Sequence, residues 1–286
     1  MENYSFVCDS SCDLSEDQLR ERSVCSVPLS FRFGSEDKEY KCNEMECNEF
    51  YLRMRDGQVA KTSGVNVMEF ISTFEPIFKN GEDIIYLGFS SALSMTYSAA
   101  CKAAEELRRK YPKRRMATID TLCASAGISL LLDLAIEKKN AGATFDEAVE
   151  FAERTKNQIC HWFTVDDLEY LKRGGRINPS TAFFGNMLGI KPLLHVDDGG
   201  RLINVGKVRG RRATLVAMCD KYGDLHEGNH DIYISHADCI DDAKLLSNML
   251  KSRFDVNTRL ITNVGPVIGS HSGPGTLALF FIGKER

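Results

Sequence analysis

The stretch Ile84-Ile-Tyr-Leu-Gly-Phe89 and the residues directly after it, Ser90-Ser-Ala-Leu-Ser-Met-Thr-Tyr97, decide the fold class of this chain. A short apolar run bounded by polar residues is typical of a buried strand. From Leu93 to Lys110, apolar and small side chains recur at helical spacing, so we expect a helix there. Similar runs at Tyr4–Cys8 and Met116–Ile119 also precede helix-like stretches. This alternation predicts an α/β domain with a mostly parallel sheet and flanking helices.

The second part of the chain has a different pattern, which begins near Cys160. The runs Ile190–Val196 and Leu202–Val208 flank the sequence Asp-Asp-Gly-Gly, and such a turn predicts a β-hairpin. Helix-like and strand-like segments alternate after it. We therefore expect an N-terminal α/β domain over residues 1–157 and a C-terminal α+β domain over residues 158–286.

A third set of strands is expected early in the chain. Val24–Phe33 and Lys38–Tyr40 are rich in β-type residues and are punctuated by Pro28 and Gly34. This pattern predicts an inserted pair of strands.

Composition and charge narrow the function classes. A net charge of -4 and a pI near 5.9 argue against a nucleic-acid-binding surface. The longest apolar runs fall well short of the ~20 residues of a membrane-spanning helix. The first residues form no export signal, so we expect a cytoplasmic protein without a membrane span. The ten cysteines are scattered without a Cys-x-x-Cys pair, which favours reduced thiols, no structural metal and no cofactor.

Two pairs of hydroxyl side chains stand just before predicted helices. Thr62-Ser63 precedes an amphipathic stretch at Val67–Phe78, and Ser90-Ser91 precedes the helix through Tyr97. Free N–H groups at a helix N-terminus, together with hydroxyls, suit a carboxylate or a phosphate. Helix capping alone is the alternative explanation. No G-x-x-x-x-G-K-[ST] sequence is present, so a nucleotide site of that type is not expected.

A glycine-rich segment near the C-terminus contains a single titratable residue. The sequence is Gly265-Pro-Val-Ile-Gly-Ser-His271-Ser-Gly-Pro-Gly275, and apolar runs flank it on both sides. We expect a loop in which His271 is partly buried beside an anion. His271 takes the central place of a would-be G-x-S-x-G motif, so serine hydrolase chemistry is not supported there.

The sequence His226-Glu-Gly-Asn-His230 matches the zinc motif H-E-x-x-H in its letters. That motif requires a helix that brings both histidines to one face. Gly228 and Asn229 favour a turn instead, so we expect no zinc site.

Basic residues gather in two places in this acidic chain. One cluster is Lys172-Arg173 with Arg176, and the other runs from Lys207 through Arg209 to Arg212. A solvated surface explains most such clusters. Arginine also suits carboxylate and phosphate groups and is enriched at protein interfaces, so an acidic partner is the alternative.

Seven segments, taken together and in order, resemble the DegV family, whose best-understood members are fatty-acid-binding subunits of bacterial fatty acid kinase. The resemblance spans nearly the whole chain. The segments are Asp9-Ser-Ser-Cys-Asp13-Leu14, Lys61-Thr-Ser63, Ser90-Ser-Ala-Leu-Ser-Met-Thr96-Tyr97, Asp166-Asp-Leu-Glu-Tyr-Leu-Lys-Arg-Gly-Gly-Arg176-Ile177, Gly189-Ile-Lys-Pro192, Lys207-Val-Arg209 and Gly265 to Gly275.

The resemblance implies a carrier and not an enzyme. A long-chain fatty acid is expected between the two domains, with its carboxylate held by Thr62-Ser63, a serine of Ser90-Ser91, and His271. A separate ATP-dependent kinase subunit is expected to phosphorylate that carboxylate. Arg209 and Arg173 are the residues expected to serve phosphotransfer or kinase docking.

The chain departs from the family pattern near the expected head-group site. Met95 replaces a glycine of the usual Leu-Ser-Gly-Thr-Tyr, and Val65-Asn66 replaces Pro-Ser. These changes bear on acyl preference. The alternative function is an enzyme that acts on a small anionic substrate at the same helix N-termini.

Overall fold

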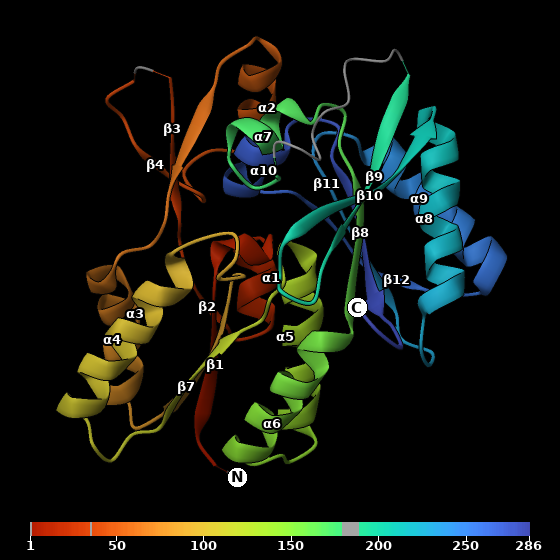
Figure 1. Ribbon diagram of the computed structural model, residues 1–286. Coiled ribbons are helices and arrows are strands. Elements are labelled where there is room, and N and C mark those ends of the chain that lie inside the picture. The colour runs from red at the N-terminus through yellow and green to blue at the C-terminus, as the bar shows by residue number, and fades with distance from the viewer. Residues whose placement is uncertain (1, 35, 179–188) are drawn as a thin grey trace.

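The computed structural model describes residues 2–34, 36–178 and 189–286, and Figure 1 shows how their helices and strands are arranged. Four strands form an all-parallel sheet in the order β2-β1-β6-β7. Their bounds are β1 Tyr4–Asp9, β2 Cys25–Val27, β6 Asp83–Gly88 and β7 Met116–Asp120. The predicted parallel sheet of the α/β class is confirmed.

A second, six-stranded sheet has the order β10-β9-β8-β13-β11-β12. Its strands are β8 Ile159–Thr164, β9 Ile190–Val196, β10 Leu202–Arg209, β11 Ile232–His236, β12 Thr258–Asn263 and β13 Leu277–Ile282. Only β11 and β12 run parallel, so this sheet is mixed. The predicted β9–β10 hairpin is confirmed, and its turn is closed by a 2.8 Å hydrogen bond from the Gly200 N–H to the Asp197 carbonyl.

A small antiparallel sheet joins β4 (Tyr40–Lys41), β3 (Ser30–Phe33) and β5 (Ala60–Ser63). The prediction of one inserted pair over Val24–Phe33 and Lys38–Tyr40 is wrong in its pairing. Pro28 divides the first segment, and β2 on its N-terminal side joins the parallel sheet beside β1. Only β3, on the other side, pairs with β4.

Helices surround these sheets. Their bounds are α1 Glu16–Glu21, α2 Cys47–Arg55, α3 Val67–Lys79, α4 Thr96–Lys110, α5 Ala126–Asn140, α6 Phe145–Thr155, α7 Glu169–Arg173, α8 Arg211–Leu225, α9 Ile240–Phe254 and α10 Pro266–Ser272. Reciprocal capping boxes start α1, α3 and α6. The expectation that the glycine-rich segment 265–275 is a loop is wrong, because most of it forms α10, with Pro266 in its first turn.

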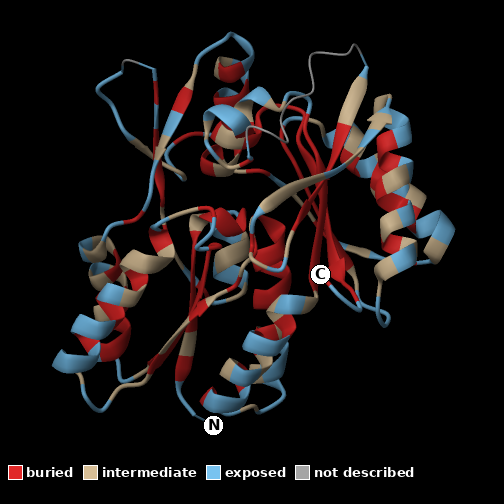
Figure 2. Ribbon diagram, in the orientation of Figure 1, coloured by how far each residue is buried: buried red, intermediate tan, exposed pale blue. Residues whose placement is uncertain are grey.

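Helix α5 lies between the parallel sheet and the six-stranded sheet, as Figure 1 shows. It contacts β6 on one side and β8, β11 and β13 on the other. Its first eight residues are all buried, as the red ribbon in Figure 2 shows. Side chains from both sheets, such as Phe6 and Phe280, belong to one apolar cluster around it. Burial on every side explains why this helix is apolar nearly all round.

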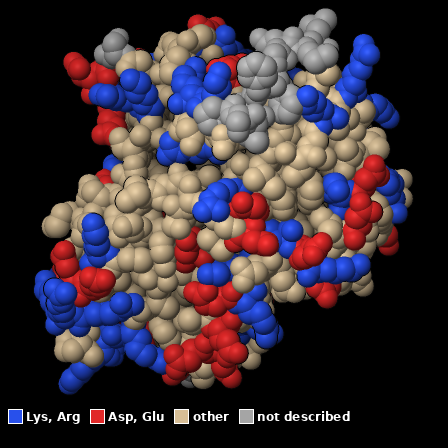
Figure 3. Space-filling view, viewed as in Figure 1, with Lys and Arg blue, Asp and Glu red and all other residues tan. Residues whose placement is uncertain are grey.

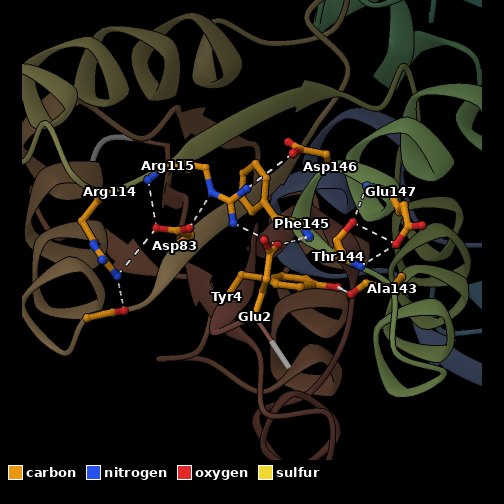
Figure 4. A network of polar contacts seen from close by, with 11 residues as sticks. Glu2, Tyr4, Asp83, Arg114, Arg115, Ala143, Thr144, Phe145, Asp146 and Glu147 are labelled. Atoms are coloured by element: carbon orange, nitrogen blue, oxygen red, sulfur yellow. Dashed lines mark hydrogen bonds and ion pairs between the residues drawn. The ribbon is translucent and has the colours of Figure 1, made fainter.

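A polar network joins the parallel sheet to the chain before α6 (Figure 4). Asp83 accepts hydrogen bonds from the backbone N–H and the Nε of Arg115, at 2.9 and 2.8 Å. Arg115 also pairs with Glu2 at 2.9 Å, and Glu2 accepts from the Phe145 N–H at 2.6 Å. The network lies at the amino-terminal end of β6.

Two further expectations concern the surface. Helix α8 ends at Leu225, and His226–His230 is not helical, so the predicted turn over the H-E-x-x-H letters is confirmed. Within the described ranges, no helix is both long enough and apolar enough to cross a membrane.

Candidate functional site

A cavity of about 240 Å³ opens between the parallel sheet, the six-stranded sheet and α10. Its lining side chains are mostly apolar and come from both halves of the chain. The apolar ones include Leu29, Phe89, Leu93, Phe163, Leu171, Val196, Leu202, Val264, Val267, Ile268, Ala278 and Phe280. Such a lining, interrupted by a few polar groups, is typical of a site for an elongated apolar ligand.

Thr62 and His271 meet at one part of this cavity. The Thr62 Oγ lies 2.8 Å from the His271 Nε2, and both side chains are half-buried. Thr62 is placed by β5, and His271 by the last turn of α10. Ser63, next to Thr62, also lines the cavity. Three of the five residues predicted to hold a carboxylate are therefore brought together.

His271 is partly buried, as predicted, and the charged side chains that act on it among the described residues are the cations Arg176 and Arg173. Burial, Arg176 and Arg173 together lower the pKa of His271 from 6.5 to about 4. The imidazole is therefore neutral at pH 7. Its Nδ1 is buried without a hydrogen bond and lies against Gly174 so closely that a Cβ on that glycine would clash with it.

Arg176, which the sequence placed in a basic cluster but not among the carboxylate-binding residues, lies at the cavity. It lines the cavity, and its Nε donates to the Leu93 carbonyl at 3.1 Å while its Nη1 donates to the Gly174 carbonyl. Burial lowers its pKa, and among the described residues no carboxylate forms an ion pair with it. A half-buried guanidinium without an acidic partner is an arrangement that suits an anionic ligand. The sequence signal was its place in the basic cluster with Lys172 and Arg173.

Ser90 and Ser91 lie outside the cavity lining. Ser90 is fully buried, and its hydroxyl donates to the Gly200 carbonyl at 2.9 Å. Ser91 is exposed, and its N–H donates to Asp120 at 3.1 Å. The turn that follows β6 points both hydroxyls elsewhere. Ser94 and Met95 line the cavity instead, and Met95 is 77% exposed at its rim.

The two arginines predicted to face a kinase are both exposed. Arg209 ends β10 opposite Ile190, and Arg173 ends α7 with its guanidinium 4.9 Å from the centre of the Tyr170 ring. Neither lines the cavity. Lys and Arg side chains are also dense on the surface near the lower ends of α3 and α4 (Figure 3), where α4 ends in Arg108-Arg-Lys110.

The family is decided by the match of a family model to nearly the whole chain. The DegV family model, described as one of uncharacterised proteins, matches residues 4–284. The chain belongs to the DegV family. A DegV domain-containing protein of Clostridium perfringens is 38% identical over 291 positions, which cover 100% of this chain and 99% of that protein. The expected family membership is thereby confirmed.

Solved DegV-like structures share the whole fold. A hypothetical protein from Thermotoga maritima, whose structure is said to reveal a fatty acid binding function, is 30% identical with a TM-score of 0.85. The match covers 98% of this chain and 99% of that one. A stearic acid-binding protein from Eubacterium ventriosum is 25% identical with a TM-score of 0.89, over 98% of both chains.

Proposed function

We propose that this protein binds one long-chain fatty acid in the cavity and presents its carboxylate to a separate ATP-dependent kinase in the cytoplasm, which forms the acyl phosphate. The observation that carries the proposal is the guanidinium of Arg176, which lines a mostly apolar cavity and has no acidic partner among the described residues. The fatty acid binding of two relatives of the same fold supports it.

The acyl chain supplies most of the affinity. Burying about 15 methylenes at ~0.8 kcal/mol each contributes roughly 12 kcal/mol, which exceeds several kcal/mol of association cost. The carboxylate opposes binding, because an unpaired buried charge is strongly unfavourable. Arg176 offsets its charge, while Thr62, Ser63 and the neutral His271 offer hydrogen bonds.

The remaining predicted residues have supporting roles around the carboxylate. Ser90 accepts backbone hydrogen bonds from Leu93 and Ser94, at 3.0 and 3.2 Å, and so holds the turn that carries Ser94 to the cavity. Ser91 lies on the same turn. Exposed Arg209 and Arg173 are free to contact a kinase or a transferring phosphoryl group, for which planar guanidinium donors are suited.

Native mass spectrometry of the purified full chain tests the binding step. We expect a mass increase equal to one long-chain fatty acid, which denaturation and extraction release. After removal of the lipid, calorimetry with stearate should give a one-to-one complex. A protein that carries a small polar anion, and that does not bind stearate, would instead favour the alternative of an enzyme acting on a small anionic substrate.

A further inference from the structure

A second polar cluster, formed by Asp13, Ser125 and Ser235, lies at the cavity away from Thr62. The Ser125 hydroxyl donates to Asp13 Oδ2 at 2.5 Å, and the Oγ atoms of Ser125 and Ser235 are 2.8 Å apart. Asp13 Oδ1 accepts from the Gly265 N–H at 2.9 Å. All three side chains are buried, and both serines line the cavity. The cluster therefore joins the loop after β1, the start of α5 and strand β11.

Counting protons shows that Ser235 has an unused hydrogen-bonding capacity. A hydroxyl carries one proton, so when Ser125 donates to the Asp13 carboxylate, Ser235 donates to Ser125. Within the described residues, only Ser125 is joined to the oxygen of Ser235 by a side-chain hydrogen bond, so in this state that oxygen accepts none from it. When Asp13 is protonated, Asp13 donates to Ser125 and Ser125 donates to Ser235. The proton of Ser235 then has no acceptor within the cluster. In either state, the Ser235 hydroxyl can form one further hydrogen bond with a group inside the cavity.

The position of the cluster follows from α10. Asp13 holds Gly265, just before the helix, while His271 lies six residues further on, or about 9 Å at 1.5 Å per residue. Val264, Val267 and Ile268 line the cavity along this length. A fatty acid whose carboxylate lies at His271 and whose tail follows α10 therefore brings the middle of its chain to Ser235.

We propose that Ser235, supported by Ser125 and Asp13, is a subsite for a hydroxyl group in the middle of the acyl chain, so that the protein accepts hydroxylated long-chain fatty acids. The inference rests on the proposed function, because it takes the carboxylate to lie at His271. An apolar cavity would exclude a hydroxyl that finds no partner. Ser235 supplies that partner, whether the hydroxyl must donate or accept.

The test compares stearate with its mid-chain hydroxylated counterpart on the delipidated full chain. We expect the wild-type protein to bind the two acids with affinities within a factor of a few. Ser235→Ala should weaken binding of the hydroxylated acid about tenfold, the value of one ordinary hydrogen bond, and leave stearate affinity unchanged or raised. Ser270→Ala is the matched control, since Ser270 is a buried serine that donates to the Pro266 carbonyl and does not line the cavity.

Two results would overturn the subsite while leaving the proposed function in place. One is a wild-type protein that binds stearate but rejects the hydroxylated acid by more than tenfold. The other is an equal loss for both acids in Ser235→Ala. The wild-type comparison decides the question even where Ser235→Ala does not fold. Failure of the wild-type protein to bind stearate at all would count against the proposed function itself.

Discussion

The Nε2 of His271 lies 2.8 Å from the hydroxyl of Thr62, although the two residues are 209 positions apart in the sequence. Thr62 stands on the three-stranded sheet, and His271 on a helix next to the six-stranded sheet. Helix α10 contacts β5 directly. The contact between Thr62 and His271 therefore forms only when these two parts of the chain pack together.

Arg176 should govern recognition of the carboxylate charge. Because its guanidinium has no acidic partner among the described residues, we expect Arg176→Met to weaken stearate binding more than tenfold, while binding of methyl stearate, which has no charge, changes little. Arg176→Lys should restore part of the loss. Arg154→Met is the control, since Arg154 is exposed on α6 and does not line the cavity. Calorimetry with both ligands measures the effect, and equal losses for acid and ester would assign Arg176 a packing role.

We expect Gly174 to be needed for fatty acid binding because it contacts His271. It has ordinary right-handed helical angles, so alanine is tolerated by the backbone, but the new Cβ would clash with the imidazole Nδ1. We expect Gly174→Ala to displace His271 and to lower stearate affinity as much as His271→Ala does, roughly ten- to a hundredfold. Gly175→Ala is the matched control. Its φ of +69° gives strain but no clash, so it should lower the melting temperature and spare affinity.

Asp13 should make stability depend on pH. Burial raises its pKa from 3.8 to about 7, so between about pH 4 and pH 7 the native protein binds more protons than the unfolded chain. The contribution of Asp13 to the free energy of unfolding is therefore fully present below pH 4 and is lost as the pH rises through 7. Raising the pH from 5 to 8 should cost the wild-type protein about 3 kcal/mol relative to Asp13→Asn.

Urea unfolding of both proteins at the two pH values checks this expectation. The lowered pKa of His271 acts in the opposite direction, because that stability is lost as the pH falls from 6.5 through about 4. Both proteins keep His271, so its effect cancels in the difference. A difference between the two proteins that is independent of pH would show that Asp13 is already ionised at pH 5.

Arg209 should separate lipid binding from phosphorylation. It is exposed at the end of β10 and does not line the cavity. We expect Arg209→Ala to bind stearate normally but to support little acyl phosphate formation with the kinase, and lysine to rescue only in part. Arg201→Ala is a control on the same hairpin, because Arg201 is also exposed. Parallel loss of both activities would place Arg209 in the fold or the lipid site.

The sequence predicted β1, β6 and β7 well, because each is a short, largely apolar run with polar ends. It did not predict α10, since Gly269 in the interior of the helix disfavours a helix in isolation. Tertiary packing reverses that preference. Gly269 lies against Tyr51, with no room for a Cβ, and the Tyr51 hydroxyl donates to the Val264 carbonyl at 2.7 Å.

The candidate site was predictable where residue type alone decides its chemistry. Thr62, Ser63 and His271 were found in this way. The direction of a side chain in a turn was not predictable, so Ser90 was preferred to Ser94, which lines the cavity. Arg176 was predicted only as part of a basic cluster on a solvated surface or facing an acidic partner, because nothing in the sequence shows that Leu93 and Gly174 hold it at the cavity.

Hydrogen exchange in helix α5 should report on slow opening of the molecule. Its buried first turns touch both large sheets, and further along it Asp133 is held by Arg22 at 2.6 Å and by the Tyr233 hydroxyl at 2.6 Å. Because both sheets cover these turns, we expect their amides to exchange slowly with water. We therefore expect the slowest hydrogen exchange among the described residues here. Its rate would report how often the two sheets separate. A lipid enclosed between them would need the same motion in order to enter or leave.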